Sequence, residues 1–302
     1  MVKEITIVSG KGGTGKTTIV ASFASLAANK VIADCDVDAP DLHLLLHPEV
    51  IKRTEFRGAK VAEMDKTMCI ECGNCASVCR FHAISDTSSG FALNPARCEG
   101  CGACVFVCEQ EAIRLSERIS GYTLVSRTRY GPMVHAQLSI GEEASGKLVT
   151  AVRTNARRVA EDEHCELVLI DGSPGIGCPV IASLTGVELA LVVTEPTMSG
   201  LHDLVRIINV ARHFGISSMV CINKYDLNET NTRKIEDFCH QQGIPIAGKV
   251  PYDSIVTEAM VEGVPVVEYS DGAVSDAIRA KGSYIKASLS RFIYKAKSSR
   301  CG

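Results

Sequence analysis

Short apolar runs alternate with longer amphipathic segments along most of the chain. The apolar runs predict buried strands at 4–10, 30–36, 165–171, 187–196, 217–224 and 244–251. Between them, apolar residues recur at helical spacing and predict helices at 16–28, 147–162, 200–213, 231–241 and 273–293. Strands that are apolar throughout and separated by helices are typical of a parallel sheet with both faces covered. The pattern therefore predicts the α/β class, with one doubly wound, mostly parallel sheet.

This alternation stops between residues 67 and 116, where the chain is instead dense in cysteine and glycine. Candidate strands at 58–65 and 121–139 flank the interruption. We interpret 67–116 as a small inserted domain carried on a β arm. The main domain would then consist of two parts, 1–66 and 117–302.

The composition is that of an ordinary folded protein. Of the 302 residues, 46% are hydrophobic and 22% are charged, which argues against wholesale disorder. The net charge of −3 gives no reason to expect nucleic acid or an anionic membrane as a partner. No apolar run approaches the roughly 20 residues of a spanning helix, and the chain enters a strand at once instead of a signal peptide. We therefore expect a cytoplasmic protein with no stable membrane insertion.

Residues 10–17 read GKGGTGKT and match the phosphate-loop pattern G-x-x-x-x-G-K-[ST]. The loop follows a predicted strand and opens a predicted helix, so backbone N–H groups and the helix N-terminus can surround a phosphate. Lys16 is expected to neutralise the phosphates, and the Thr17 hydroxyl to bind Mg²⁺. The predicted nucleotide contacts of this loop are Gly10, Lys11, Gly12, Gly13, Thr14, Gly15, Lys16, Thr17 and Thr18.

Acidic residues follow two predicted strands, at the sheet edge where such a site lies. One segment reads DCDVDAPD over 34–41, and the other contains Asp171 at the end of an apolar run. Asp171 is expected to hold Mg²⁺ through water. Asp36 is expected to orient the attacking water, with Asp38 in support.

The segment INKYD, residues 222–226, is the candidate base-reading loop. Asn223 is predicted to contact the base. The same segment resembles the N-K-x-D loop of GTPases, in which the Asp226 position would read a guanine. The residues of this loop alone leave the choice between ATP and GTP open.

Eight of the 14 cysteines lie between 69 and 108, in two C-x₂-C-x₂-C-x₃-C runs offset by 29 residues. Such a pair is typical of a bacterial two-cluster ferredoxin, in which the fourth cysteine of each run binds the other [4Fe–4S] cluster. The predicted ligands of the first cluster are Cys69, Cys72, Cys75 and Cys108. Those of the second are Cys98, Cys101, Cys104 and Cys79. The proline that usually follows each run is replaced by Arg80 and Glu109. A pair of Cys₄ zinc sites is the alternative, although zinc does not require this spacing twice.

Together these motifs resemble the MinD/ParA/Mrp and nitrogenase-iron-protein ATPases, and in particular a subgroup with an inserted ferredoxin domain. GKGGTGKT resembles their deviant phosphate loop, and DCDVDAPD and DGSPGIGCP resemble their two switch segments. The resemblance implies ATP as the nucleotide and a homodimer that encloses ATP between its protomers. Lys11 would then reach the nucleotide of the partner protomer. Base contacts would come from Asn223 and from the P-x-D loop, at Pro251 and Asp253.

Three functions are compatible with this resemblance. The first, which we expect, couples ATP hydrolysis to electron transfer with a redox partner protein. The second is an iron–sulfur or metal-cofactor assembly or carrier ATPase that delivers from Cys178. The third is a positioning ATPase like MinD, whose membrane contact would need an amphipathic helix at 283–300. Hydrolysis is expected to be slow without a partner in every case.

Cys178 raises one further alternative. It matches one of the cysteines that hold a bridging cluster in the nitrogenase iron protein, but Glu143 stands where the other would be. We expect a plain buried thiol; a thiolate near the dimer axis and a ligand for a transient metal or cluster are the alternatives.

Overall fold

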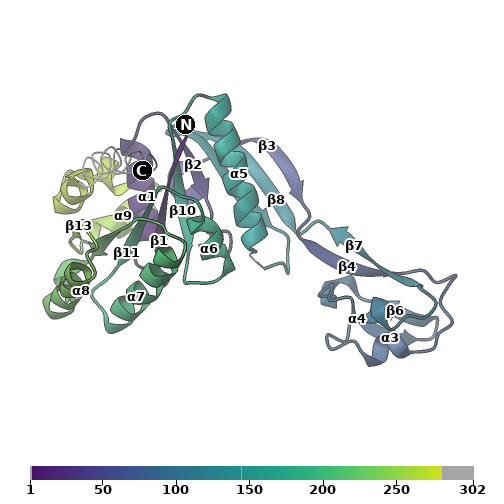
Figure 1. The fold of residues 1–302 in the computed structure, drawn as a ribbon. Helices are drawn as coiled ribbons and strands as arrows, with labels where there is room; N and C mark the ends of the chain where they lie inside the picture. The colour runs from purple at the N-terminus through teal and green to yellow at the C-terminus, as the bar shows by residue number, and fades with distance from the viewer. Residues whose placement is uncertain (1, 144, 281–302) are drawn as a thin grey trace, which may run out of the picture. The chain divides into compact units, whose positions relative to one another are not determined.

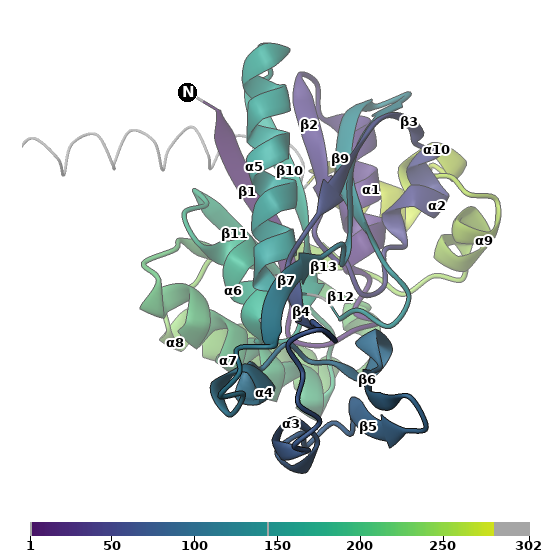
Figure 2. The same ribbon diagram turned by 90° about the vertical axis from the view of Figure 1, so that its right-hand side faces the viewer.

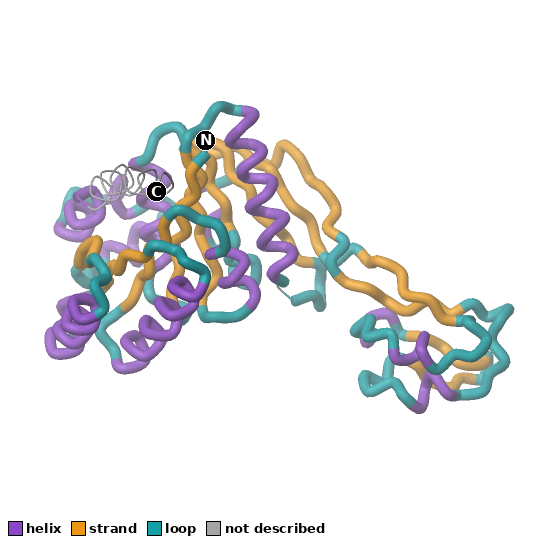
Figure 3. Tube along the Cα trace, viewed as in Figure 1, coloured by secondary structure: helices purple, strands orange, loops and turns teal. Residues whose placement is uncertain are grey.

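The structure, a computed structural model, describes residues 2–143 and 145–280. The described chain forms two compact units. The larger unit comprises 2–53, 123–136 and 145–280, and the smaller unit comprises 54–122 and 137–143. The predicted insertion 67–116 falls entirely within the smaller unit. Helices and strands of both units can be followed in Figure 1 and Figure 3.

A mostly parallel sheet forms the centre of the larger unit, as predicted. The predicted strands appear as β1 (Lys3–Ser9), β2 (Lys30–Asp34), β10 (Leu167–Pro174), β11 (Leu189–Thr194), β12 (Ser218–Asn223) and β13 (Ile246–Val250). The segment predicted at 121–139 is divided into β8 (Gly121–Thr128) and β9 (Gly131–Leu138), and β3 (Glu49–Phe56) was not predicted. The strand order is β13-β12-β11-β1-β10-β2-β9-β8-β3, with parallel pairing from β13 through β9. The C-terminal ends of the parallel strands therefore meet at one edge.

Helices cover both faces of this sheet. They are α1 (Lys16–Leu26), α2 (Leu42–Leu46), α5 (Gly146–Asp162), α6 (Cys178–Leu184), α7 (Met198–His213), α8 (Glu229–Gln241), α9 (Ile255–Val261) and α10 (Val266–Tyr269), with the short turn η2 (Tyr225–Leu227). A last described helix spans 273–280, and the remainder of the segment predicted at 273–293 lies outside the described residues. Among the described helices, none is long and apolar enough to cross a membrane.

Among the described residues of the larger unit, hydrophobic clusters lie on both sides of the sheet. Ile7 of β1 contributes to the cluster under α1, α2, α9 and α10, whereas the next residue, Val8, contributes to the cluster under α6, α7 and α8. Figure 2 shows α1, α2 and α10 on one side of the sheet and α5 to α8 on the other. This alternation explains the continuously apolar strands in the sequence, since neighbouring residues point to opposite, equally buried faces.

A buried histidine lies on β9. His135 Nε2 and Ser126 Oγ are 2.9 Å apart, and both side chains are buried. Burial, with a smaller contribution from the charge of His43, lowers the pKa of His135 to about 4. The folded protein therefore holds His135 neutral, whereas the unfolded chain takes up a proton at this residue below its ordinary pKa of 6.5.

This difference predicts a pH-dependent stability. Between pH 6.5 and pH 4, His135 should reduce the free energy of unfolding by about 3 kcal/mol in total, because only the unfolded state gains the proton. His135→Gln should remove this part of the pH dependence. Urea denaturation of both proteins across this range measures it, with the exposed His240→Gln as control. Parallel pH curves for His135→Gln and the parent would contradict the assignment.

The sequence repeat of the smaller unit is accompanied by a repeat of its backbone conformation. Its elements are β4 (Ala59–Met64), α3 (Asn74–Ser77), β5 (Ile84–Thr87), β6 (Gly90–Leu93), η1 (Pro95–Arg97), α4 (Ala103–Phe106) and β7 (Ile113–Arg118). β4 pairs with β7 and β5 with β6, both antiparallel. The capping glycines of α3 and α4, Gly73 and Gly102, have φ angles of 79° and 81°. These glycines are 29 residues apart, as are the starts of α3 and α4, so the cysteine repeat is a structural repeat.

The hydrophobic core of the smaller unit is small. Of the described residues, seven buried ones form it, and three of these are cysteines. A core of this size contributes little stability, and natural domains of similar size rely on disulfides or bound metals. None of the described cysteines of this unit forms a disulfide. The unit therefore lacks disulfide support among its described residues.

Candidate nucleotide site and cysteine cavities

The phosphate loop connects β1 to α1 at the C-terminal edge of the sheet. Gly15 has a φ of 86°, and a Cβ atom there would lie 2.2 Å from Asn223 Nδ2. A Cβ atom on Gly10 would lie 2.4 Å from the Asp203 Cβ atom of α7. Because both positions exclude a side chain, the two glycines allow the loop to pack against α7 and the end of β12.

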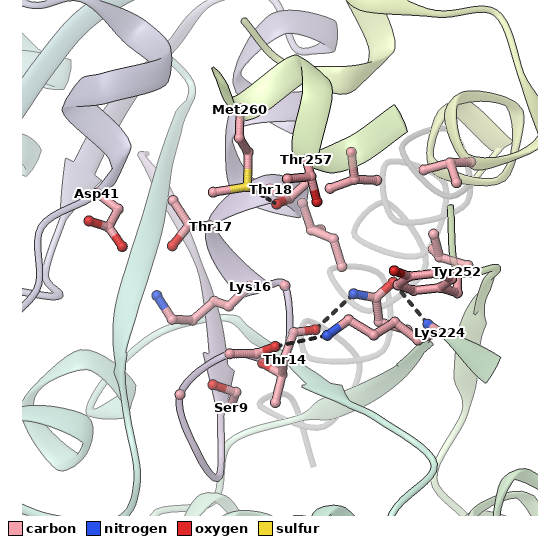
Figure 4. A pocket seen from close by; sticks show the side chains of 18 of the residues that line it. Ser9, Thr14, Lys16, Thr17, Thr18, Asp41, Lys224, Tyr252, Thr257 and Met260 are labelled. Carbon is pink, nitrogen blue, oxygen red and sulfur yellow. Dashed lines mark hydrogen bonds between the residues drawn. The ribbon is translucent and has the colours of Figure 1, made fainter. Parts of the chain in front are cut away.

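A cavity of about 370 Å³ opens above this loop. Its volume lies within the range of small-molecule sites. Residues 12–19 line one side, residues 250–253, 256, 257 and 260 line another, and Asn223 and Lys224 also border the cavity. Figure 4 shows Lys16 and Thr17 near one another, Met260 beside Thr18, and Tyr252 beside Lys224. The predicted contacts Gly12, Gly13, Thr14, Gly15, Lys16, Thr17, Thr18, Asn223, Pro251 and Asp253 all line it.

Lys16 is buried among carboxylates. Its Nζ atom donates to Asp171 Oδ1 and lies 3.2 Å from Asp36 Oδ2. Burial by itself would lower the pKa of Lys16, but the charges of Asp171 and Asp36 outweigh burial and raise it. Lys16 is therefore a permanent cation, held in the place where a phosphate would be neutralised.

The two predicted magnesium ligands meet at this lysine. The Thr17 hydroxyl donates to Asp171 Oδ2 over 3.0 Å. One carboxylate and one hydroxyl, completed by substrate phosphates and water, are the oxygen ligands that Mg²⁺ takes in phosphate-loop enzymes. The residues present therefore fit the ion.

The acidic segment 34–41 contains two buried aspartates. Burial raises the pKa of Asp36, and the charge of Asp171 adds to this effect. Burial also raises the pKa of Asp34 well above its ordinary value, and its Oδ1 atom accepts from Asp36 N over 3.1 Å. Asp34 thus fixes the backbone of Asp36, whose carboxyl group faces the cavity. Asp38 is exposed and lies outside the cavity lining.

Lys11 lies outside the lining of its own cavity. Its Nζ atom is 2.6 Å from Glu195 Oε1 and 3.1 Å from Ser199 Oγ. Glu195 also pairs with Lys224 over 3.4 Å. Burial by itself would raise the pKa of Glu195, but the neighbouring Lys11 and Lys224 outweigh burial and lower it. Sequence reasoning missed Glu195, because it lies far from Lys11 along the chain and belongs to no motif.

Asn223 and Lys224 support the phosphate loop through hydrogen bonds to its backbone carbonyl groups. Asn223 Nδ2 donates to Thr14 O over 2.8 Å, and Lys224 Nζ donates to Gly13 O over 3.1 Å. Asn223 was predicted as a base contact; it borders the cavity, but its amide N–H is engaged by the loop. Lys224 was not predicted, although the N-K pair in the sequence is a signal for this role.

The eight clustered cysteines separate into two cavities of the smaller unit. Cys69, Cys72, Cys75 and Cys108 line one, and Cys79, Cys98, Cys101 and Cys104 line the other. In each cavity one run thus supplies three cysteines and the other run supplies the fourth. No three His, Cys, Asp or Glu side chains of the described chain are close enough to share one metal ion. The cysteines surround a space and do not converge on a point.

Cys178 is exposed and begins α6. A Cβ atom on Gly146 would lie 3.1 Å from Cys178 O, so α5 and α6 pack closely at this end. Because Cys178 is exposed, the expectation of a buried thiol is wrong. Its predicted roles in an intersubunit site stay predictions.

Similarity to known proteins concerns the nucleotide-binding fold. Residues 5–266 match the CobQ/CobB/MinD/ParA nucleotide binding domain. An uncharacterized protein of Methanocaldococcus jannaschii, MJ0578, is 35% identical over 282 residues, which are 92% of this chain and 95% of that protein. The septum site-determining protein MinD of Neisseria meningitidis is 23% identical over 294 residues, 92% of this chain and 89% of that protein.

Among solved structures, MinD of Pyrococcus horikoshii, complexed with Mg-ADP, superposes with a TM-score of 0.57 at 18% identity, covering 94% of this chain and 96% of that one. MinD of Aquifex aeolicus, in a complex with MinC, gives a TM-score of 0.58 at 15% identity over 95% and 96%. These similarities do not test the ferredoxin-like insertion or the relation to the nitrogenase iron protein. The family match covers most of the chain. This chain belongs to the CobQ/CobB/MinD/ParA nucleotide-binding domain family.

Proposed function

We propose that this protein is an ATP-hydrolysing switch that works as a homodimer, with ATP enclosed between two protomers. The observation that carries the proposal is the separation of the two loop lysines. Lys16 is buried at the phosphate end of the cavity, whereas Lys11 is held outside it by Glu195. A second lysine that faces away from its own site is suited to reach the site of another protomer.

Hydrolysis would use the residues gathered around Lys16. When the nucleotide binds, its phosphates replace the Asp171 carboxylate as the partner of Lys16. The lysine charge then neutralises the phosphates. Thr17 and Asp171 hold Mg²⁺, which when bound supplies further positive charge to the phosphates. Asp36 accepts the proton of the attacking water as the water oxygen bonds to the γ-phosphorus and the bond to ADP breaks. Its raised pKa makes it a better base than an exposed aspartate.

Lys11 must leave Glu195 before it can reach the partner protomer, so breaking this ion pair lowers the free energy gained on dimer formation. Glu195→Gln should lower the ATP concentration that gives half-maximal dimer by about threefold, because a partly exposed ion pair contributes up to roughly 1 kcal/mol. Sedimentation across an ATP titration measures this midpoint. The exposed Glu229→Gln is the control. A midpoint that stays at the parent value or rises would contradict the restraining role of Glu195.

We further propose that the smaller unit binds two [4Fe–4S] clusters. Support comes from the two cysteine cavities, because each cysteine of such a cluster binds a different iron atom and the sulfurs therefore surround the group. Backbone N–H groups donate to sulfur, from Ala62 and Gly100 to Cys98 Sγ over 3.4 Å each and from Ala83 to Cys79 Sγ over 3.3 Å. Such bonds favour a thiolate, so the residues present fit the clusters, which when bound would supply one-electron chemistry.

The comparisons favour a MinD/ParA-like switch over the redox enzyme expected from the sequence. Several relatives and structural neighbours are septum site-determining or ParA family proteins, and one of these structures is a complex with a second protein, MinC. We therefore propose that the ATP-bound dimer binds a partner protein and releases it after hydrolysis. Affinity capture of partners with ATP and with ADP tests this, and equal capture in both states would contradict it. The segment 283–300, which a MinD-like membrane contact would need as an amphipathic helix and which we expect instead to pack as an ordinary final helix, lies outside the described residues.

Electron transfer is the second candidate, and the cysteine cavities are the observation that favours it. The test is the rate at which the reduced protein transfers electrons to an artificial acceptor, with and without ATP. An ATP-dependent rate would support redox coupling, and equal rates would leave the clusters with a structural role. The assembly function, in which clusters are delivered from Cys178, is tested separately. It requires that labile iron be transferred from this protein to an apo-acceptor.

A further inference from the structure

Asp226 stands at the meeting point of two loops that follow adjacent strands. β12 and β13 pair in parallel, with Asn223 opposite Val250. The turn η2 follows β12, and the Pro251–Asp253 loop follows β13. Asp226 Oδ1 accepts from the backbone N–H of Tyr252 over 2.7 Å. This hydrogen bond ties the second loop to the first.

The Asp226 carboxylate supports the cavity without lining it. Pro251, Tyr252 and Asp253 all border the cavity, whereas Asp226 lies outside the described lining. Figure 4 shows Tyr252 and Lys224 on the same side of the cavity. A residue that read a guanine directly would need its carboxylate directed at the base, but here a backbone N–H occupies one carboxylate oxygen.

The loop that Asp226 holds also sets the position of α9. Asp253 Oδ1 accepts from Ile255 N over 3.0 Å at the start of this helix. Val256, Thr257 and Met260 of α9 line the cavity next to this loop, and Met260 Sδ also lies 4.0 Å from Thr18 Oγ1. A shift of the loop would therefore move the wall against which a base would pack.

The phosphate end is fixed by the neighbours of Asp226. Asn223 and Lys224 hold the backbone of the phosphate loop. One short segment, 223–226, thus supports both ends of the site with different residues. Its first two residues support the phosphate end and its last supports the base end.

We propose that Asp226 is a positioning residue for the nucleotide base, acting through the Pro251–Asp253 loop. The inference rests on nucleotide binding in this cavity, and it is independent of dimer formation. Asp226→Ala removes the acceptor for Tyr252 N, whereas Asp226→Asn keeps an oxygen acceptor of the same size. The two variants therefore separate the hydrogen bond from the charge.

Calorimetric titration of the full-length protein with ADP, GDP and inorganic tripolyphosphate tests the proposal. Asp226→Ala should weaken ADP binding about fivefold, equivalent to about 1 kcal/mol, and leave tripolyphosphate binding unchanged. Asp226→Asn should bind ADP as the parent does. Thermal unfolding of each variant without nucleotide controls for a general loss of structure.

Two results would overturn the proposal. One is equal ADP affinity in Asp226→Ala and the parent. The other is a parent preference for GDP that Asp226→Asn abolishes, since this would mean that the carboxylate reads guanine itself. A protein that binds ADP as expected but never dimerises with ATP would contradict the proposed switch and leave the role of Asp226 intact.

Discussion

Replacing Lys11 by alanine should reduce the rate of ATP hydrolysis by about a hundredfold, the scale observed when one preorganised donor to a transition-state oxyanion is removed. Lys11 lies outside its own cavity, so ATP affinity at low protein concentration should stay near the parent value. Lys16 keeps its buried place in this variant and continues to neutralise the phosphates.

Steady-state hydrolysis and nucleotide titration measure the two quantities separately. Lys52→Ala, which replaces an exposed lysine of β3, is the matched control. A Lys11→Ala protein that hydrolyses ATP at the parent rate would refute a catalytic role for Lys11. A protein that loses ATP affinity to the same extent as hydrolysis would place Lys11 in its own site.

Replacing Cys79 by alanine should remove one of the two proposed clusters and reduce the iron content from about eight to about four atoms per chain. Its cavity is otherwise lined by cysteines of the second run, Cys98, Cys101 and Cys104. The loss should also destabilise the smaller unit by several kcal/mol, because metal-binding free energy contributes to folding in domains with little core.

Double variants test the exchange of cysteines between the runs. Cys79→Ala with Cys101→Ala should still hold about four iron atoms, because both act on one cluster. Cys79→Ala with Cys72→Ala should hold almost none. Cys165→Ala, which lies in the larger unit, is the control. The reverse pattern would show that each run binds its own cluster, and a colourless protein containing zinc would show that the sites are Cys₄ zinc sites.

The fold of the larger unit could be predicted where periodicity is strong. The buried strands have runs of apolar residues, so each was found within a few residues of its observed ends. β3 was missed because its residues are nearly all exposed, and its three apolar residues among polar ones form no run of a buried strand. α2 and α6 have five and seven residues, too few to show a helical period.

The site could be predicted as far as its residues belong to motifs. The loop, Thr17 with Asp171 and the grouping of the cysteines were all read from spacing. Contacts between segments distant in the sequence could not be predicted from spacing, and the ion pair of Lys11 with Glu195 is the clearest example. The engaged amide of Asn223 is another, since its partner is a backbone oxygen that no sequence pattern reports.

The central claim, that Lys11 acts on the ATP of the other protomer, is tested most directly by mixing two inactive proteins. Lys11→Ala lacks the lysine, and Asp36→Asn lacks the proposed base but keeps Lys11. In a mixed dimer, the site on the Lys11→Ala protomer has its own Asp36 and receives Lys11 from its partner. If the protomers exchange freely, an equal mixture should recover about a quarter of the parent hydrolysis rate, since half of the dimers are mixed and each has one complete site. A mixture that stays as inactive as its components would contradict the claim.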